Sequence, residues 1–234
     1  MLREDQVSRY ARQLLVPGIG EAGQERLLEA RVRVVGASSV GGPALVYLVQ
    51  AGAGTIWIDD PEAVGPADLE AWVYPPSAQG TPRVAAAQGH LAPLSRFTAV
   101  EPYPTGGVPT AALVCAASQV QALAVAEACR RAGIPHVVAE VDGEGGSVIS
   151  IPPGAPCYRC AHSTGTGRPA LPGAAALGAL AALELVQLVA DPGASRGRRI
   201  DLLRGVPAAR PTVRLAGCAC GEPTGAAAAP DGGA

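Results

Sequence analysis

Lysine is absent from this sequence of 234 residues, and aromatic residues make up only 3% of it. Every fixed cationic side chain is therefore an arginine. A phosphate contact that other proteins make with lysine must come here from arginine or from backbone amides. With so few aromatic rings, the apolar core has to be assembled from alanine, valine and leucine.

Charge is also scarce, and the net charge is only −2. A protein that binds nucleic acid usually carries a basic patch, which this composition does not supply, so we expect no nucleic-acid partner. A membrane span needs about 18 or more apolar residues in a row. The most apolar stretch, 170–190, is interrupted by Pro172, Glu184 and Gln187. We therefore expect no membrane partner.

The first residues do not have the pattern of a secretory signal, and we expect a cytoplasmic protein whose thiols are reduced. The sequence contains six cysteines. In a reducing compartment these are metal ligands or core residues sooner than disulfides.

Residues 31–60 have the pattern of a strand, a turn, a helix and a second strand. The start is rich in β-branched apolar residues, which is typical of a strand buried on both faces. Small residues follow, then a mostly apolar helix that glycines terminate. The expected elements are a strand over 32–35, a loop over 36–42, a helix over 43–51 and a strand over 55–58.

This stretch predicts a nucleotide pocket. A glycine-rich turn between a strand and a helix presents backbone amides that bind phosphate. The glycines of the dinucleotide pattern Gly-x-Gly-x-x-Gly stand at Gly36 and Gly41, while its second position is Ser38. Asp60 follows the second strand, where a ribose hydroxyl would be held. The alternative is a tight turn in a parallel sheet that binds no ligand.

Strand and helix patterns alternate from residue 31 to residue 145, which predicts an α/β fold. We expect a Rossmann-like, mostly parallel sheet with helices on both faces and an antiparallel C-terminal extension after Gly146. Residues 1–221 would form one nucleotide-binding domain, with a Rossmann-like half over 31–145 and a second half over 146–221. The low-complexity tail, 222–234, should be disordered. Strands are expected near 32–35, 55–59, 97–101, 112–116, 136–140, 199–203 and 212–215, and the longest helix over 171–190.

Several separate stretches together carry a family resemblance. The chain resembles the ThiF/MoeB/HesA family, the bacterial relatives of ubiquitin-activating enzymes, over about residues 5–221. The stretches are Arg9–Leu15 with Gly18–Gly20 and Gly23-Gln24 (the opening RYxRQ…GxxGQ), Gly36–Gly42 (the nucleotide loop), Ala51–Gly54 with Ile58 and Asp60, Gly80–Val84 (GxPKV), Pro156–Cys160 (the first zinc half) and Gly173–Leu188.

The resemblance implies an adenylyltransferase that uses Mg-ATP. Family members adenylate the C-terminal Gly-Gly carboxylate of a ubiquitin-like sulfur carrier protein. Carried over to this sequence, Asp60 matches the acid that holds the ribose, and Arg83 stands where the family has a catalytic lysine. Arg12 matches an arginine that reaches the phosphates of a neighbouring subunit, which implies a homodimer or a heterodimer with a related chain.

Three departures from the family pattern indicate impaired or altered chemistry. The position of the catalytic arginine holds Ala71, in a segment that also contains the acids Asp68 and Glu70. The position of the Mg-binding aspartate holds Ala117, which weakens the expected Mg²⁺ site. Ser38 and Ser39 replace loop glycines. One hypothesis is an active enzyme with remodelled chemistry.

Two other hypotheses stand beside the remodelled enzyme. The chain can be a non-catalytic family member that serves as a binding or scaffold partner of a carrier protein or of an active paralogue. A nicotinamide oxidoreductase would use the same loop, but it has no role for the RYxRQ opening or for the Cys-x-x-Cys ending.

Four of the six cysteines form two close pairs near the end of the chain. Cys157 and Cys160 have the spacing of one half of a tetrahedral zinc site. Cys218 and Cys220 would complete it, although the family has Cys-x-x-Cys there and this chain has Cys-x-Cys. We predict a structural Zn²⁺ ion, and the alternative is two unrelated pairs of free thiols.

Overall fold

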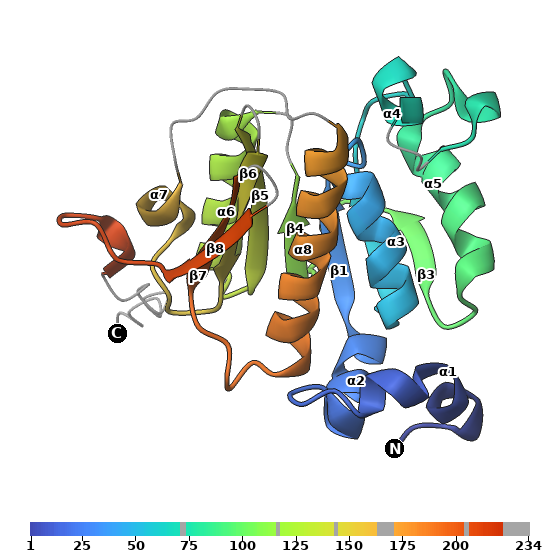
Figure 1. Ribbon diagram of the computed structural model, residues 1–234, viewed down its shortest axis with the longest axis horizontal. Coiled ribbons are helices and arrows are strands. Elements are labelled where there is room, and N and C mark those ends of the chain that lie inside the picture. The colour runs from blue at the N-terminus through green and yellow to red at the C-terminus, as the bar shows by residue number, and fades with distance from the viewer. Residues whose placement is uncertain (71–73, 116–117, 143–144, 163–170, 204–205, 222–234) are drawn as a thin grey trace, which may run out of the picture.

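The structure is a computed structural model (Figure 1), and it describes residues 1–70, 74–115, 118–142, 145–162, 171–203 and 206–221. Eight strands form a single sheet in the order β3-β2-β1-β4-β5-β6-β7-β8. The strands are β1 (Arg31–Val35), β2 (Thr55–Asp59), β3 (Ala99–Pro102), β4 (Ala111–Val114), β5 (His136–Asp142), β6 (Gly145–Ile151), β7 (Arg198–Leu203) and β8 (Val206–Pro211).

Helices cover both faces of the sheet and its lower edge (Figure 1). They are α1 (Glu4–Leu14), α2 (Gly20–Glu29), α3 (Gly41–Ala51), α4 (Pro66–Glu70), α5 (Arg83–Leu91), α6 (Gln119–Arg131), α7 (Tyr158–Ala161) and α8 (Leu171–Ala190). Short 3₁₀ turns span η1 (Pro76–Ala78), η2 (Ala92–Leu94) and η3 (Ala219–Gly221).

The sheet is parallel from β3 to β5 and antiparallel from β5 to β8. β1 lies inside the sheet, between β2 and β4. The chain leaves β1 through α3 on one face and leaves β4 through α6 on the other, so the carboxyl ends of β1 and β4 meet at the switch point where open α/β sheets bind ligands. The expected fold class is confirmed.

Two apolar layers hold the helices on the sheet. One layer joins α3, α5 and α8 to the sheet, and the other joins α6 and α7 to its opposite face. α8 has a window, Gly173–Ala190, that is apolar enough by composition to cross a membrane, but 56% of it is buried within the protein. Its contacts with α3, β5 and β6 are those of a core helix.

The last strand lies earlier than the sequence predicts. The expected strand over 212–215 is absent among the described residues, and β8 covers Val206–Pro211 instead. All residues of β8 are exposed, so no apolar alternation marks it in the sequence. It is the edge strand, whose outer side needs no amide donors, and prolines are therefore tolerated in it.

Candidate functional site

The turn from β1 to α3 is as tight as backbone geometry allows. Gly36 has φ +85°, and its amide donates to the Asp59 carbonyl at 3.1 Å. A Cβ on Gly41 would lie 1.9 Å from the Gly36 carbonyl oxygen. α3 begins at Gly41, where the Gly42 amide donates to the Ser38 carbonyl at 2.7 Å and the Ala44 amide donates to the Val40 carbonyl at 3.4 Å. The turn therefore places the N-terminus of α3, which favours anions, at the carboxyl edge of the sheet.

We expect Gly41→Ala to destabilise the protein by about 3 kcal/mol, because the methyl group would overlap backbone that cannot move aside. Gly89→Ala is the matched control: Gly89 is exposed on α5 and a Cβ there meets nothing within 4 Å. That change should be neutral or stabilise by up to about 1 kcal/mol. Urea denaturation measures both, and equal stability of the two variants would contradict this account of the turn.

Asp60 lies at this edge, and its acceptors are filled by the chain itself. One carboxylate oxygen accepts from the Ala37 amide at 2.7 Å, and the other from the Glu62 amide at 2.9 Å. The Arg83 guanidinium lies 3.3 Å from both oxygens. The sequence places Asp60 correctly beside the loop, but it gives no sign that Arg83 would cover the carboxylate proposed for ribose.

Asp68 on α4 is the second acid of the site, and its side chain is only 1% exposed. It accepts from the Ser38 hydroxyl at 2.5 Å, from the Gly65 amide at 2.8 Å and from Arg83 Nε at 3.0 Å. In the structure this carboxylate therefore faces donors of its own chain.

Two further features of the site complete its electrostatics. Burial opposes the charge of Arg83, but Asp60 and Asp68 outweigh it and raise the pKa of the guanidinium, which stays protonated. Tyr74 was not among the predicted residues. Its hydroxyl donates to the Ala37 carbonyl at 2.7 Å, and burial together with Asp60 raises the pKa of the phenol.

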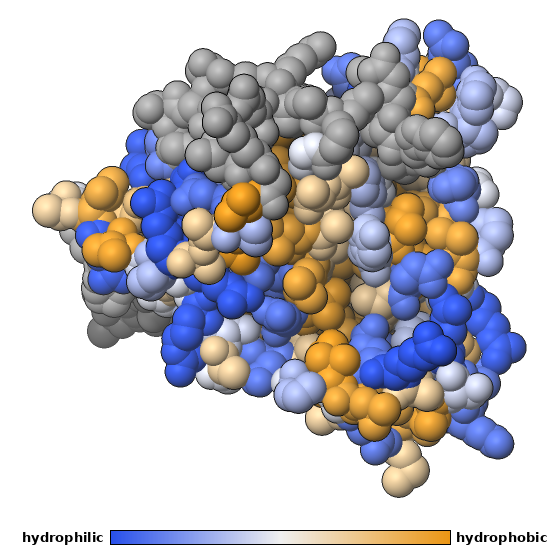
Figure 2. Space-filling model, in the orientation of Figure 1, coloured by the Kyte–Doolittle hydropathy of each residue, from blue (hydrophilic) through white to orange (hydrophobic). Residues whose placement is uncertain are grey.

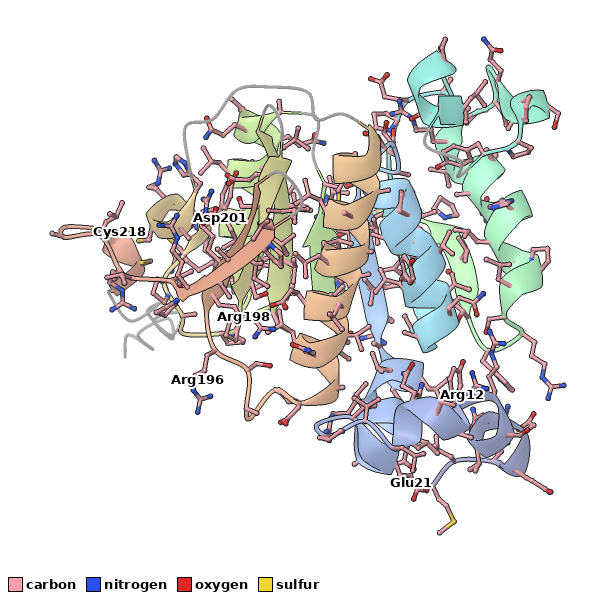
Figure 3. All side chains as sticks on the ribbon, in the orientation of Figure 1. Arg12, Glu21, Arg196, Arg198, Asp201 and Cys218 are labelled. Carbon is pink, nitrogen blue, oxygen red and sulfur yellow. The ribbon has the colours of Figure 1, made fainter. Side chains whose placement is uncertain are left out.

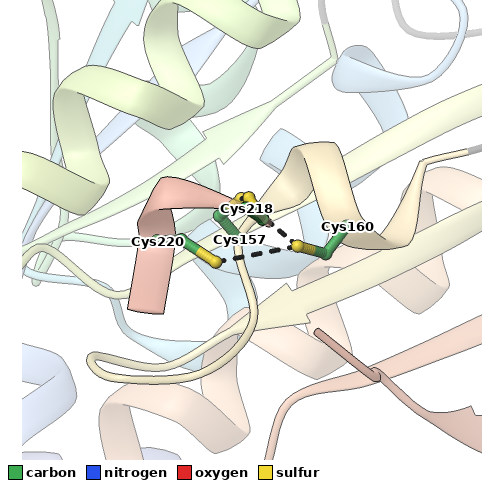
Figure 4. Close-up of side chains that lie close together, drawn as sticks. All are labelled: Cys157, Cys160, Cys218 and Cys220. Atoms are coloured by element: carbon green, nitrogen blue, oxygen red, sulfur yellow. Dashed lines mark hydrogen bonds between the residues drawn. The ribbon is translucent and has the colours of Figure 1, made fainter. Parts of the chain in front are cut away.

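The four clustered cysteines come together (Figure 4), on the side of the molecule where Figure 3 labels Cys218. All four sulfur atoms lie within 4.8 Å of one another. Sγ–Sγ distances are 3.8 Å for Cys157–Cys160, 3.7 Å for Cys157–Cys218 and 3.6 Å for Cys160–Cys220. Four thiolates around one zinc ion, with bonds of about 2.3 Å, would be separated by about 3.8 Å. The arrangement fits a tetrahedral metal and is too wide for disulfides, whose S–S bond is about 2.05 Å.

A model of the ThiF family matches residues 10–216. The chain belongs to the ThiF family. It is 29% identical over 216 residues to the SAMP-activating enzyme E1 of Haloferax volcanii, covering 83% of this chain and 80% of that protein. It is 32% identical over 229 residues to the adenylyltransferase and sulfurtransferase MOCS3 of Bos taurus, covering 87% of this chain and 50% of that protein. The chain thus spans half of the length of MOCS3.

Solved structures confirm the ThiF-type fold. The structure of E. coli MccB with MccA superposes with a TM-score of 0.79 at 16% identity, covering 94% of this chain and 75% of MccB. At this identity the likeness concerns the fold.

The opening RYxRQ segment of this ThiF-family chain is largely a structural clamp. Tyr10 is buried against the end of α3, where a Cβ on Gly52 would meet its ring at 2.6 Å. Gln13 and Gln24 both donate to the Ala51 carbonyl, at 2.9 and 3.1 Å. These three side chains therefore fix the C-terminus of α3, a role the resemblance did not reveal.

Arg12 is exposed on α1, at the edge of the sheet opposite the glycine loop (Figure 3). The 11 residues of α3 separate the two regions by about 16 Å, at 1.5 Å per residue. The structure therefore does not bring Arg12 together with Gly36, Ser38, Gly41, Asp60 and Arg83 in one chain. A role in the pocket of a neighbouring subunit stays a prediction.

Ala71 and Ala117, the two positions at which the resemblance predicts replaced catalytic groups, lie outside the described residues. Their surroundings are partly described. Cys115 directly follows β4 and lies beside β1, because its amide donates to the Val35 carbonyl at 2.8 Å. Burial raises the pKa of its thiol to about 12, so it is no nucleophile at neutral pH.

Proposed function

We propose that this chain binds ATP and adenylates the C-terminal carboxylate of a ubiquitin-like sulfur carrier protein ending in Gly-Gly, with altered chemistry. The β1–α3 turn with Asp60 beside it carries the proposal, because it places a glycine-rich loop, the N-terminus of α3 and a carboxylate together at the sheet's switch point. Two relatives support the substrate class by their names: one is a sulfur carrier protein adenylyltransferase, and the other is a SAMP-activating enzyme E1.

In the proposed reaction a carboxylate oxygen of the carrier attacks the α-phosphorus of ATP. The bond from the α-phosphorus to the bridging oxygen breaks, pyrophosphate leaves, and an acyl adenylate forms. The loop from Gly36 to Gly41 would hold phosphate, Asp60 the ribose, and Arg83 would stabilise charge on the phosphates once it leaves its carboxylate partners. Ala117 supplies no metal ligand, so Mg²⁺ would depend on the phosphates and on other oxygen donors.

Assembly is part of this proposal, with residues 1–221 acting as one domain in the cytoplasm. Arg12 can serve a nucleotide only across an interface, in a homodimer or in a heterodimer with a related chain. Apolar side chains gather over α8 in Figure 2, where Leu183 is 51% exposed, and Leu15 after α1 is 83% exposed. A second polypeptide would cover such side chains favourably.

A second function, that of a non-catalytic scaffold for a carrier or for an active paralogue, is favoured by one observation. The Asp60–Arg83–Asp68 arrangement is complete without a nucleotide. Exchange of labelled pyrophosphate into ATP distinguishes the two functions, because only an enzyme that forms the adenylate reversibly supports it.

We expect carrier-dependent exchange by the wild-type protein, about 10²-fold or more reduced in Arg83→Ala, because a cation at the phosphates is lost. Arg96→Ala is the matched control, since Arg96 is 70% exposed and pairs with Asp5 on the surface; it should exchange normally. A wild-type protein that binds the carrier but supports no exchange would establish the scaffold function instead.

A further inference from the structure

Three positions that depart from the family pattern meet in space. Ser38 lies in the loop after β1, Asp68 on α4 and Arg83 at the start of α5. Asp68 contacts both of the others, through the Ser38 hydroxyl at 2.5 Å and through Arg83 Nε at 3.0 Å. The three substitutions are therefore one interlocking set rather than independent losses.

Arg83, one member of this set, also lies over the carboxylate of Asp60, which would have to accept hydrogen bonds from the ribose. A carboxylate has about four acceptor positions. On Asp60 the Ala37 and Glu62 amides take two, and the Arg83 guanidinium faces both oxygens. A ribose diol could reach Asp60 only after Arg83 moves.

Arg83 bridges the two acids, and Asp68 fixes it there. Only a guanidinium can donate from Nε to one carboxylate and from Nη1 to another in the same plane. The side chains of Asp60 and Asp68 are 3% and 1% exposed, so breaking the bridge leaves a buried charge without its partner. The three charges also sum to −1, which opposes entry of a polyphosphate.

We propose that Asp68 is a positioning residue that closes the ligand-free nucleotide pocket. It holds Arg83 over Asp60, and it accepts a hydrogen bond from the Ser38 hydroxyl of the loop. This inference rests on the proposed function, since it concerns the same pocket. ATP binds when Arg83 exchanges its two carboxylates for the phosphates, and Asp68 sets how costly that exchange is. ATP should therefore bind weakly unless a divalent cation offsets the negative charge of Asp68.

Isothermal titration with ATP, with and without Mg²⁺, tests the proposal on Asp68→Asn. The amide keeps the shape but removes the charge, so we expect ATP to bind about tenfold or more tightly, with a smaller effect of Mg²⁺. A role confined to stability would leave the affinity unchanged or lower it. Asp68→Glu, which restores the charge, should return the affinity toward that of the wild type.

Asp59→Asn is the matched control. Asp59 is the neighbouring acid on β2, but it is 33% exposed and pairs with Arg33 instead of Arg83. Its neutralisation should change ATP affinity less than twofold. If Asp68→Asn does not fold, Arg83→Lys takes its place. A single ammonium nitrogen cannot reproduce the separate Nε and Nη1 bonds to the two acids, so this variant should also bind ATP more tightly.

The outcomes separate the two proposals. Wild-type protein that binds ATP, with equal or weaker binding by Asp68→Asn and Arg83→Lys, would overturn the role of Asp68 and leave the proposed function intact. Absence of ATP binding by the wild type and by every variant would overturn the proposed function, and this role of Asp68 with it.

Discussion

Purified protein is expected to contain about one zinc ion per chain, and the double variant Cys157→Ser, Cys160→Ser is expected to contain none. The sulfur atoms of the four-cysteine cluster already lie at the separations that a tetrahedral ion requires. The Cys-x-Cys pair, one residue shorter than the family pattern, still reaches the cluster because η3 turns the chain between Cys218 and Cys220.

Loss of the ion should loosen the C-terminal segment before the nucleotide half. Residues 212–220 are exposed or half-buried, and one of their few contacts with the rest of the protein is the Leu215 amide on Cys160 Sγ at 3.4 Å. Metal bonds would therefore supply most of the cohesion there. Structural zinc in small domains contributes on the order of 10 kcal/mol of binding free energy, and it is lost as falling pH protonates the thiolates.

Elemental analysis and thermal melting, with and without a chelator, check this prediction. Cys129→Ala is the control, since Cys129 is buried on α6 outside the four-cysteine cluster; its zinc content should be unchanged even if its melting temperature falls. Metal-free wild-type protein that melts at the same temperature as the zinc-loaded protein would show that the cluster is not a structural metal site.

The sequence predicts the inner parallel strands well because their fully buried positions must be apolar. The valines of β1 and the run Ala111–Val114 of β4 have no polar alternative, and the tight turn at Gly36 follows from its glycines. β8 could not be predicted, because an exposed edge strand is specified by its pairing with β7 and not by its own residues.

The positions of the site residues could be predicted from the sequence, but the contacts among their side chains could not. Asp60 could be placed from the length of the β1–α3–β2 unit alone. That Arg83 would lie over it depends on three segments, the loop, α4 and α5, meeting in three dimensions. A substitution examined singly, such as Ser38 for glycine, looks like a loss, and only its contact with Asp68 shows that it has a compensating partner.

Introducing the groups that the family pattern has at positions 71 and 117 is expected to produce the largest change in rate. An arginine that stabilises phosphoryl charge contributes about 10³-fold or more to the rate, and a metal ligand adds to this. We therefore expect the double variant Ala71→Arg, Ala117→Asp to accelerate carrier adenylation by about 10³-fold in single-turnover measurements. Cys115, two residues before position 117 in the sequence, follows β4 and donates its amide to the Val35 carbonyl of β1 at 2.8 Å.

A control must add the same two charges elsewhere. Ala124→Asp, Ala128→Arg places them on the exposed side of α6 and should leave the rate unchanged. Adding Asp68→Asn to the restored variant should lower the ATP concentration needed for half-maximal rate without a comparable change in the maximal rate, because it acts on pocket closure and not on the transferring phosphoryl group. If wild-type protein already adenylates its carrier as fast as the restored variant, Ala71 and Ala117 are not the positions that limit its chemistry.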